Sequence, residues 1–288
     1  MKDLSNISVV KEILRNNNFN FSKSFGQNFI VDPMVCPNMA DACLNSVDDG
    51  VIEIGPGIGT LTVQLAERFK KVVSIEIDKR LIPILNSNLS DFDNVEIIQN
   101  DILKTDINEI IKSKFCDCEK VSICANLPYY ITSEIIMYIL ENEFNINSIV
   151  VMIQKEAAER ICALPGTRKS GAISLAVRYF GNPEILFDVD RDCFIPSPNV
   201  DSSVIRITMD KSSSKDVKDR KTFFKVVKAA YSQRRKNLLN SLSSGLGIAK
   251  GSVSKLLETA NIDSNIRAEN LQFTDFVNIS NLLFDDLN

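Results

Sequence analysis

A glycine-rich loop follows a run of apolar, β-branched residues in the first quarter of the chain. Gly55, Gly57 and Gly59 occupy alternate positions, and Thr60 follows them. Glycines between a strand and a helix let a ligand approach the backbone, and the free N–H groups at the start of the helix can bind it. Dinucleotide sites need the wider spacing G-x-G-x-x-G, so the loop disfavours a nicotinamide-dependent oxidoreductase.

Three acidic residues stand at or beside predicted strands around this loop. Glu53 precedes the glycines, and the tight G-x-G-x-G form with such an acid resembles the S-adenosyl-L-methionine (AdoMet) methyltransferase fold. Glu76 ends the next strand, where a carboxylate can accept hydrogen bonds from both ribose hydroxyls. Asp101 follows the third strand, where it can accept a hydrogen bond from an adenine amino group. The three acids together with the glycines predict an AdoMet site.

A second loop, Asn126-Leu127-Pro128-Tyr129, ends the fourth predicted strand. Tetrapeptides N-[IL]-P-[YF] at this place resemble the signature of methyltransferases that act on a planar amino nitrogen, above all that of adenine. The Asn126 side-chain oxygen and the Leu127 carbonyl can accept the two amino hydrogens and favour a pyramidal nitrogen. Pro128 fixes the turn, and Tyr129 offers a ring on which an extruded base can stack.

The composition limits the chemistry further. The chain has no histidine, which excludes histidine bases, histidine metal ligands and triads that depend on histidine. Methylation of an adenine nitrogen is compatible with this, because the proton can leave after transfer without a strong base. Seven cysteines are scattered, and only Cys116 and Cys118 lie close together, so we expect reduced thiols and no bound metal.

The apolar pattern predicts an open α/β sheet that positions these loops. Short runs without polar alternation are typical of parallel strands covered on both faces. We expect strands at Val51–Ile54, Val72–Ile77, Val95–Ile98, Val121–Cys124 and Ser148–Ile153. The helices expected between them are Thr60–Phe69, Lys79–Asn88, Ile107–Lys112 and Ser133–Glu141.

The pattern changes near residue 210. Two more strands are expected at Glu184–Val189 and Ser203–Met209, and the tract Asp210–Asp216 has the composition of a linker. Beyond it we expect only short amphipathic helices. We therefore predict a first domain over residues 1–210, with an N-terminal arm over 1–30, and a small all-helical domain over 217–288.

The charge distribution suggests a nucleic-acid partner for the helical domain. The whole chain has a net charge of −4, which argues against phosphate binding, but Lys211 to Lys236 contain ten Lys or Arg against two Asp. A solvated helix face is the alternative for such a run. The RNA-binding residues that we predict are Lys221, Lys225, Lys228, Arg234, Arg235 and Lys236.

These motifs and their flanks together resemble the ribosomal RNA adenine dimethyltransferase family, in particular the members that act on the small subunit. The flanking matches are the elements at residues 23–30 (K-x-x-G-Q-N-F, then Ile), 154–156 (Q-K-E), 194–202 (F-x-P-x-P-x-V-D-S) and 233–238 (Q-R-R-K-x-L). The resemblance implies that Asn28 and Ile30 contact AdoMet, as does Asn126, and that Phe194 brackets the flipped base opposite Tyr129.

The resemblance also implies the fold and the reaction. The fold would be a Rossmann-like class I AdoMet-dependent methyltransferase sheet with a small C-terminal helical domain. The reaction would be dimethylation of two adjacent adenosines near the 3′ end of 16S rRNA, within the 30S subunit or its late precursor. We expect a cytoplasmic protein, because no apolar run approaches the ~18 residues of a membrane span. We also expect a monomer, since nothing in the sequence suggests an obligate dimer.

Two alternatives remain open at this point. The first is a large-subunit rRNA adenine methyltransferase of the macrolide-resistance type, which usually reads N-I-P-Y and lacks the Q-R-R-K element. The second is a non-catalytic ribosome-assembly or transcription factor on the same fold. Leu127 and Gln233–Lys236 disfavour the first, and the intact Asn126, Tyr129 and Glu76 disfavour the second.

Overall fold

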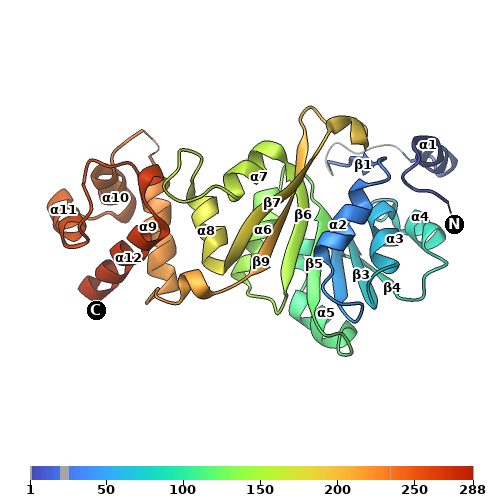
Figure 1. Cartoon of the computed structure of the whole chain (residues 1–288), viewed down its shortest axis with the longest axis horizontal. Helices are drawn as coiled ribbons and strands as arrows, with labels where there is room; N and C mark the ends of the chain where they lie inside the picture. The colour runs from blue at the N-terminus through green and yellow to red at the C-terminus, as the bar shows by residue number, and fades with distance from the viewer. Residues whose placement is uncertain (1, 20–25, 234, 288) are drawn as a thin grey trace. The chain divides into compact units, whose positions relative to one another are not determined.

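The computed structural model describes residues 2–19, 26–233 and 235–287 (Figure 1). The chain divides into two compact units. The first contains residues 1–158 and 184–209, and the second contains residues 159–183 and 210–288.

A seven-stranded sheet forms the centre of the first unit. Its strand order is β4-β3-β2-β5-β6-β9-β7. The strands are β2 (Gly50–Ile54), β3 (Lys71–Glu76), β4 (Val95–Gln99), β5 (Val121–Asn126), β6 (Ser148–Gln154), β7 (Gly181–Val189) and β9 (Ser202–Met209). Strands β2 to β6 pair in parallel, whereas β9 is antiparallel to β6. The predicted parallel strands are confirmed.

Helices cover the sheet because its central strands are apolar on both faces. All five residues of β2 are buried. Helices α2 (Val35–Cys43) and α3 (Thr60–Ala66) lie over one face (Figure 1) and share an apolar cluster with β2, β3, β5 and β6. A second cluster joins α1 (Ile7–Asn16) to α4 (Ile82–Asn88).

The remaining helices of this unit are α5 (Ile107–Lys114) and α6 (Thr132–Glu141). Helix α6 packs against a short 3-10 helix, η2 (Ile102–Lys104). Helix α5 connects β4 to β5, and α6 connects β5 to β6, as expected for repeated βα units.

The strand order places the two sequence motifs next to each other. Strand β2 pairs with β3 on one side and with β5 on the other. After β2 the chain continues to β3 in one half of the sheet, whereas after β5 it continues to β6 in the other half. The carboxyl ends of parallel strands at such a switch point form a crevice in which ligands bind. The glycine loop follows β2 and the Asn126 loop ends β5, so both lie at this crevice.

A separate two-stranded sheet joins distant parts of the chain. Strand β1 (Phe29–Ile30) pairs antiparallel with β8 (Phe194–Ile195), which follows the short 3-10 helix η3 (Arg191–Cys193). Phe29 is opposite Ile195, and Ile30 is opposite Phe194. The sequence analysis predicted neither strand, because two residues are too few to show a periodicity.

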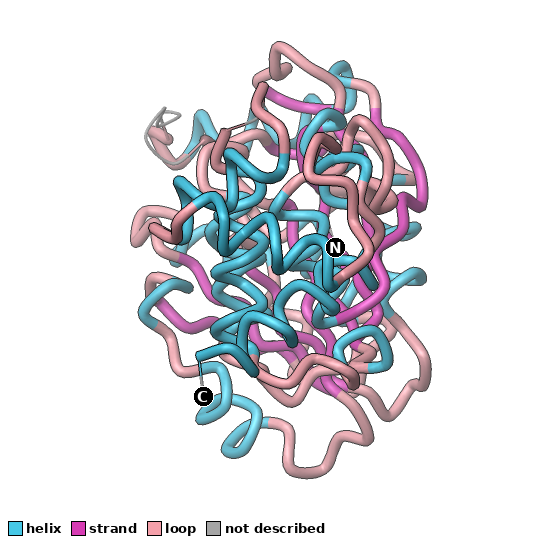
Figure 2. Tube along the Cα trace, turned by 90° about the vertical axis from the view of Figure 1, so that its left-hand side faces the viewer, coloured by secondary structure: helices cyan, strands magenta, loops and turns pink. Residues whose placement is uncertain are grey.

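The second unit has a helical core. Its helices are α8 (Ala172–Phe180), α9 (Arg220–Tyr231), α10 (Leu238–Leu246), α11 (Lys250–Thr259) and α12 (Phe273–Leu287), with short 3-10 helices η4 (Ser212–Ser214) and η5 (Ala268–Asn270). Figure 2 shows the C-terminal end of the chain as helix and loop. Among the described residues after Met209 there is no strand.

Residues 159–183 lie in the second unit, whereas the division predicted from the sequence placed them in the first domain. Helix α7 (Lys155–Ile161) crosses the division, and α8 lies wholly in the second unit. Leu175 of α8 belongs to the same apolar cluster as Phe223 and Leu242, and the Tyr179 ring lies 5.3 Å from that of Phe223. Apolar burial therefore assigns α8 to the helical unit. No helix of the described chain is long and apolar enough to cross a bilayer.

Candidate active site

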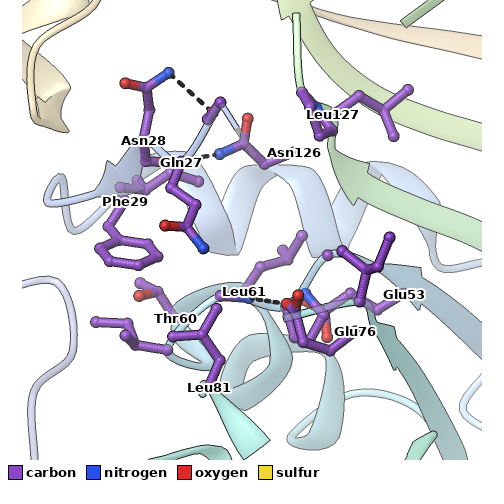
Figure 3. A pocket seen from close by; sticks show the side chains of 18 of the residues that line it. Gln27, Asn28, Phe29, Glu53, Thr60, Leu61, Glu76, Leu81, Asn126 and Leu127 are labelled. Carbon is purple, nitrogen blue, oxygen red and sulfur yellow. Dashed lines mark hydrogen bonds between the residues drawn. The ribbon is translucent and has the colours of Figure 1, made fainter. Parts of the chain in front are cut away.

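A pocket opens at the carboxyl edge of β2, β3 and β5. Figure 3 shows its lining side chains, which come from residues 26–30, the glycine loop, the end of β3 and the Asn126 loop. The lining residues predicted from the sequence are Asn28, Ile30, Glu53, Gly55, Gly57, Glu76, Asn126, Leu127, Pro128 and Tyr129. Ten of the predicted site residues therefore line one cavity.

Two glycines of the loop adopt conformations that only glycine adopts readily. Gly55 has φ +69°, and a Cβ built on it would meet nothing within 4 Å. Gly57 has φ +62°, and its Cβ would lie 3.0 Å from Cε1 of Phe29. The first glycine leaves room for a ligand against the backbone, and the second lets the Phe29 ring close one wall.

Glu53 is a buried carboxyl with one oxygen unpaired. Its Oε2 accepts hydrogen bonds from the hydroxyls of Thr62 and Ser74, each at 2.7 Å. Its Oε1 is buried and has no hydrogen-bond partner among the described residues. Burial raises the pKa of Glu53 to about 7, against the opposing effect of the two hydroxyls. A buried acceptor beside a pocket is suited to a cationic ligand.

Glu76 joins the end of β3 to the glycine loop. One of its oxygens accepts from the Gly57 N–H at 3.3 Å (Figure 3), and the other accepts from the Asp78 N–H at 2.7 Å. Burial raises the pKa of Glu76 to about 7, although both N–H groups favour the ionised form. The carboxyl is thus held at the pocket wall by backbone on two sides.

The buried carboxyls make the stability of the ligand-free protein depend on pH. The folded pKa of Glu53 is above its unfolded value of 4.5, so its stabilising contribution is complete below pH 4.5 and is lost as the pH rises through about 7. We expect the free energy of unfolding to fall between pH 5 and pH 8, and Glu53→Gln to reduce that fall by roughly 1–3 kcal/mol. Urea unfolding at several pH values tests this, and an unchanged pH profile in the variant would contradict it.

Asn126 is held in one orientation by the N-terminal arm. Its Nδ2 donates to the backbone carbonyl of Asn28 at 3.1 Å (Figure 3). This contact assigns the other end of the amide, Oδ1, as an acceptor, and no described residue donates to it. The Leu127 N–H donates to Met152, and its carbonyl accepts no hydrogen bond among the described residues. Two acceptors of the target loop are therefore available.

Tyr129 lines the pocket with a half-buried ring. Its hydroxyl lies 2.7 Å from the hydroxyl of Ser202, the first residue of β9. Burial raises the pKa of the Tyr129 phenol, so the neutral form is favoured even more strongly than usual. Tyr130, the next residue, is 60% exposed.

Three predicted site residues do not line the pocket. Gly59 begins α3 with φ +97°, and its Cβ would lie 3.3 Å from Leu89, which gives it a role in packing. Asp101 caps η2 by accepting from the Leu103 N–H, so its side chain is turned to its own loop. Phe194 is only 3% exposed and belongs to the core cluster beneath α2.

The burial of Phe194 changes the expected base site. The prediction that Phe194 brackets the base opposite Tyr129 does not match the structure, because the ring is enclosed by apolar side chains and offers no face to the pocket. In this structure Tyr129 is the aromatic side chain that the target loop supplies to the cavity.

Several residues that line the pocket were not predicted from the sequence. Gln27 and Phe29 lie in the quoted N-terminal motif, and the Gln27 amide donates to Asp78 at 2.8 Å. Asp78 also pairs with Arg80 at 2.6 Å, which fixes this wall beside Glu76. Ile77 follows the end of β3 and is 50% exposed at the pocket, an exposure that its apolar side chain does not indicate in the sequence.

The predicted RNA-binding lysines share one face of α9. Lys221, Lys225 and Lys228 are exposed, whereas Phe223 and Val227 on the other face are buried. In the loop that follows, Arg235 and Lys236 are also exposed, and Arg234 lies outside the described residues. The spacing of the lysines at i, i+4 and i+7 gives a basic stripe along the helix.

The family of the chain is shown by comparison with known protein families. The model of the family described as "Ribosomal RNA adenine dimethylase" matches residues 18–285. The chain belongs to this family. Membership agrees with the α/β sheet and helical unit described above and confirms the resemblance drawn from the motifs.

Curated relatives of the family cover nearly the whole chain. The "Ribosomal RNA small subunit methyltransferase A" of Clostridioides difficile is 46% identical over 98% of both chains. The protein of the same name from Alkaliphilus metalliredigens is 47% identical over 95% of both chains.

Two solved structures share the fold. A dimethyladenosine transferase from Plasmodium falciparum has a TM-score of 0.73 at 26% identity, covering 89% of this chain and 97% of its own. The 23S rRNA methyltransferase ErmE has a TM-score of 0.66 at 23% identity, covering 89% of this chain and 99% of its own. The second likeness shows the fold alone.

The pocket has buried acceptors and an open stretch of backbone that suit AdoMet. AdoMet carries two cationic groups, an ammonium and a sulfonium. The unpaired oxygen of Glu53 supplies a buried acceptor in the pocket lining. Glu76 is placed to receive ribose hydroxyls, and Gly55 leaves the backbone open to a ligand. The residues present therefore fit the cofactor.

Proposed function

We propose that this protein transfers methyl groups from AdoMet to the N6 amino groups of adenosines in small-subunit rRNA and makes N6,N6-dimethyladenosine. The observation that carries the proposal is the orientation of Asn126. Its amide nitrogen is bound by the Asn28 carbonyl, so its oxygen remains to accept from a target amine. The family and its small-subunit relatives agree with this reaction.

The geometry supports a mechanism without a strong base. The Asn126 oxygen and the Leu127 carbonyl accept the two N6 hydrogens, which draws the nitrogen lone pair out of conjugation with the purine ring. AdoMet supplies an electrophilic methyl group. When bound, it would give that methyl group to the exposed N6 lone pair and leave as S-adenosyl-L-homocysteine, and the N6 proton would leave for solvent without a protein base. Placement and charge stabilisation supply the rate enhancement.

Tyr129 holds the base during this step. Base–aromatic stacking is worth about 1–3 kcal/mol per base, and it is compatible with a base extruded from an RNA strand. Phe29 and Leu81 line the same pocket as apolar neighbours. The cavity thus combines an apolar wall with the two acceptors of the target loop.

The wider context extends the proposal. The substrate would be 16S rRNA within the 30S subunit or its late precursor, and the two adjacent adenosines near its 3′ end would be the targets. The protein would act as a cytoplasmic monomer. Its helical unit, residues 159–183 and 210–288, would bind RNA through the basic stripe of α9.

The basic stripe gives a direct test of RNA binding. We expect Lys221→Glu with Lys225→Glu to weaken binding to small subunits about tenfold or more and to reduce the salt dependence of binding, because two phosphate contacts are lost. Binding is measured by filtration across a series of KCl concentrations. Lys112→Glu with Lys120→Glu is the control, since it makes the same charge change at exposed sites of the first unit. Equal losses in the two double variants would contradict a specific stripe.

The reaction is tested with labelled AdoMet on under-methylated small subunits and, in parallel, on large subunits. Nucleoside analysis should find dimethyladenosine only in the small-subunit RNA. Dimethyladenosine in large-subunit RNA would favour the macrolide-resistance type. AdoMet binding without transfer to either subunit would favour a non-catalytic assembly factor.

A further inference from the structure

Ser202 carries a buried hydroxyl whose side-chain contact is with the target-base loop. The residue is 0% exposed, and its Oγ lies 2.7 Å from the Tyr129 hydroxyl. Among the described residues its side chain makes no other hydrogen bond. A buried hydroxyl without a partner is costly, so the contact with Tyr129 satisfies both groups.

The backbone of Ser202 is fixed by its neighbours. It is the Cα partner of Gln154 at the end of β6. The carbonyl of Asp201 accepts the Lys155 N–H at 3.0 Å, and the hydroxyl of Ser203 donates to Asp188 at 2.7 Å. Ser202 is therefore a rigid anchor, whereas Tyr129 stands in the turn between β5 and α6.

We propose that Ser202 is a positioning residue that fixes the position of the Tyr129 ring, and that the second methyl transfer to each adenosine depends on it more than the first. This inference rests on the proposed function. It assigns a role to the last residue of the F-x-P-x-P-x-V-D-S element, in which Phe194 is enclosed in the core.

The difference between the two transfers follows from counting hydrogens. The amino group of adenosine has two, which can bind both the Asn126 oxygen and the Leu127 carbonyl. N6-methyladenosine keeps one, so a single acceptor orients it, and its methyl group must turn away from the incoming one. Stacking on a fixed ring then supplies a larger share of the orientation. A Tyr129 ring without its anchor is therefore expected to slow the second transfer more than the first.

The test separates the two products. Ser202→Ala and Tyr129→Phe are each assayed on under-methylated small subunits, with N6-methyladenosine and N6,N6-dimethyladenosine followed over time. We expect the second transfer to slow about three- to tenfold, the size of one lost hydrogen bond, with the first slowed less than twofold. The monomethyl product should accumulate. The double variant should be no worse than either single variant, because both act through the same contact.

Ser203→Ala is the matched control. Ser203 is also 0% exposed and makes one side-chain hydrogen bond. Its partner is Asp188, which does not line the pocket, whereas the partner of Ser202 is Tyr129. Its loss should lower the melting temperature to a similar degree and leave the ratio of the two products unchanged. Proportional slowing of both transfers in Ser202→Ala, or the same product shift in Ser203→Ala, would overturn the proposal. Failure of the unmodified protein to methylate small subunits would instead count against the proposed function.

Discussion

Asn126→Ala is expected to reduce methyl transfer by about 10²–10³-fold at saturating AdoMet, the loss found when one aligned polar group is removed from a transition state. The variant loses the acceptor that binds an N6 hydrogen. AdoMet affinity should change by less than about threefold, because the amide contacts the Asn28 carbonyl and the target-loop side of the pocket. Single-turnover kinetics and calorimetric titration with AdoMet measure the two quantities separately.

A surface asparagine provides the control for this variant. Asn142 follows the last residue of α6, is exposed, and donates to the Tyr138 carbonyl at 2.8 Å. Asn142→Ala should leave both transfer and AdoMet binding unchanged. If Asn126→Ala mainly weakened AdoMet binding and kept the transfer rate at saturation, Asn126 would act only as the cofactor contact that the family resemblance implies, and its proposed role toward the target amine would be wrong.

Glu76→Gln is expected to weaken AdoMet binding more than methyl transfer, the opposite of the effect expected for Asn126→Ala. The amide keeps one oxygen, but its NH2 end must face the N–H of either Gly57 or Asp78, so one hydrogen bond of the wall is lost. The negative charge that favours ribose hydroxyls is also lost. We expect the Kd for AdoMet to rise about 10- to 100-fold, the range of a hydrogen bond to a charged group, while transfer at saturating AdoMet recovers substantially.

Glu96→Gln on the neighbouring strand is the control for charge. Glu96 lies in β4 and pairs with Lys114 at 2.7 Å, outside the pocket lining. Its replacement should leave the Kd for AdoMet unchanged. A Glu76→Gln protein that binds AdoMet with unchanged affinity would remove Glu76 from the proposed ribose contact.

The parallel sheet and its loops could be predicted from the sequence because the signals are local. Runs such as Ser148–Ile153 are continuous and β-branched, and a strand buried on both faces needs that composition. Gly55 and Asn126 were found by their motifs, and the strand order then places both loops at one crevice. Five strands in parallel leave few topologies to consider.

Two residues singled out by the motifs lie outside the pocket lining in this structure, where burial or capping competes with the motif. Asp101 stands where a carboxylate could reach a ligand, but an aspartate before a short helix also caps it, and the structure shows the cap. Phe194 was read as a stacking ring, yet a large apolar ring gains more from the core than from an open pocket. Sequence alone does not rank these competing uses.

Long-range contacts were out of reach of the sequence. Asn126 and Asn28 are 98 positions apart, and Tyr129 and Ser202 are 73 apart. No periodicity or spacing reports such a pair. Helix α8 shows the same limit, because its apolar face fits either unit until its partner, α9, is known.

The pairing of β1 with β8 has a consequence for the synthesis of the protein itself. Residues 29–30 line or border the cofactor pocket, but their strand partner is at 194–195, and the anchor of Tyr129 follows at 202. A nascent chain that has exposed only its first 190 residues has the glycine loop and Asn126, but β1 lacks its partner and the β6 edge lacks β9. Emergence of those last strands, late in translation, completes the pocket. The pocket of the first unit therefore depends on residues 194–202, which the ribosome adds only after the glycine loop and the Asn126 loop have been synthesised.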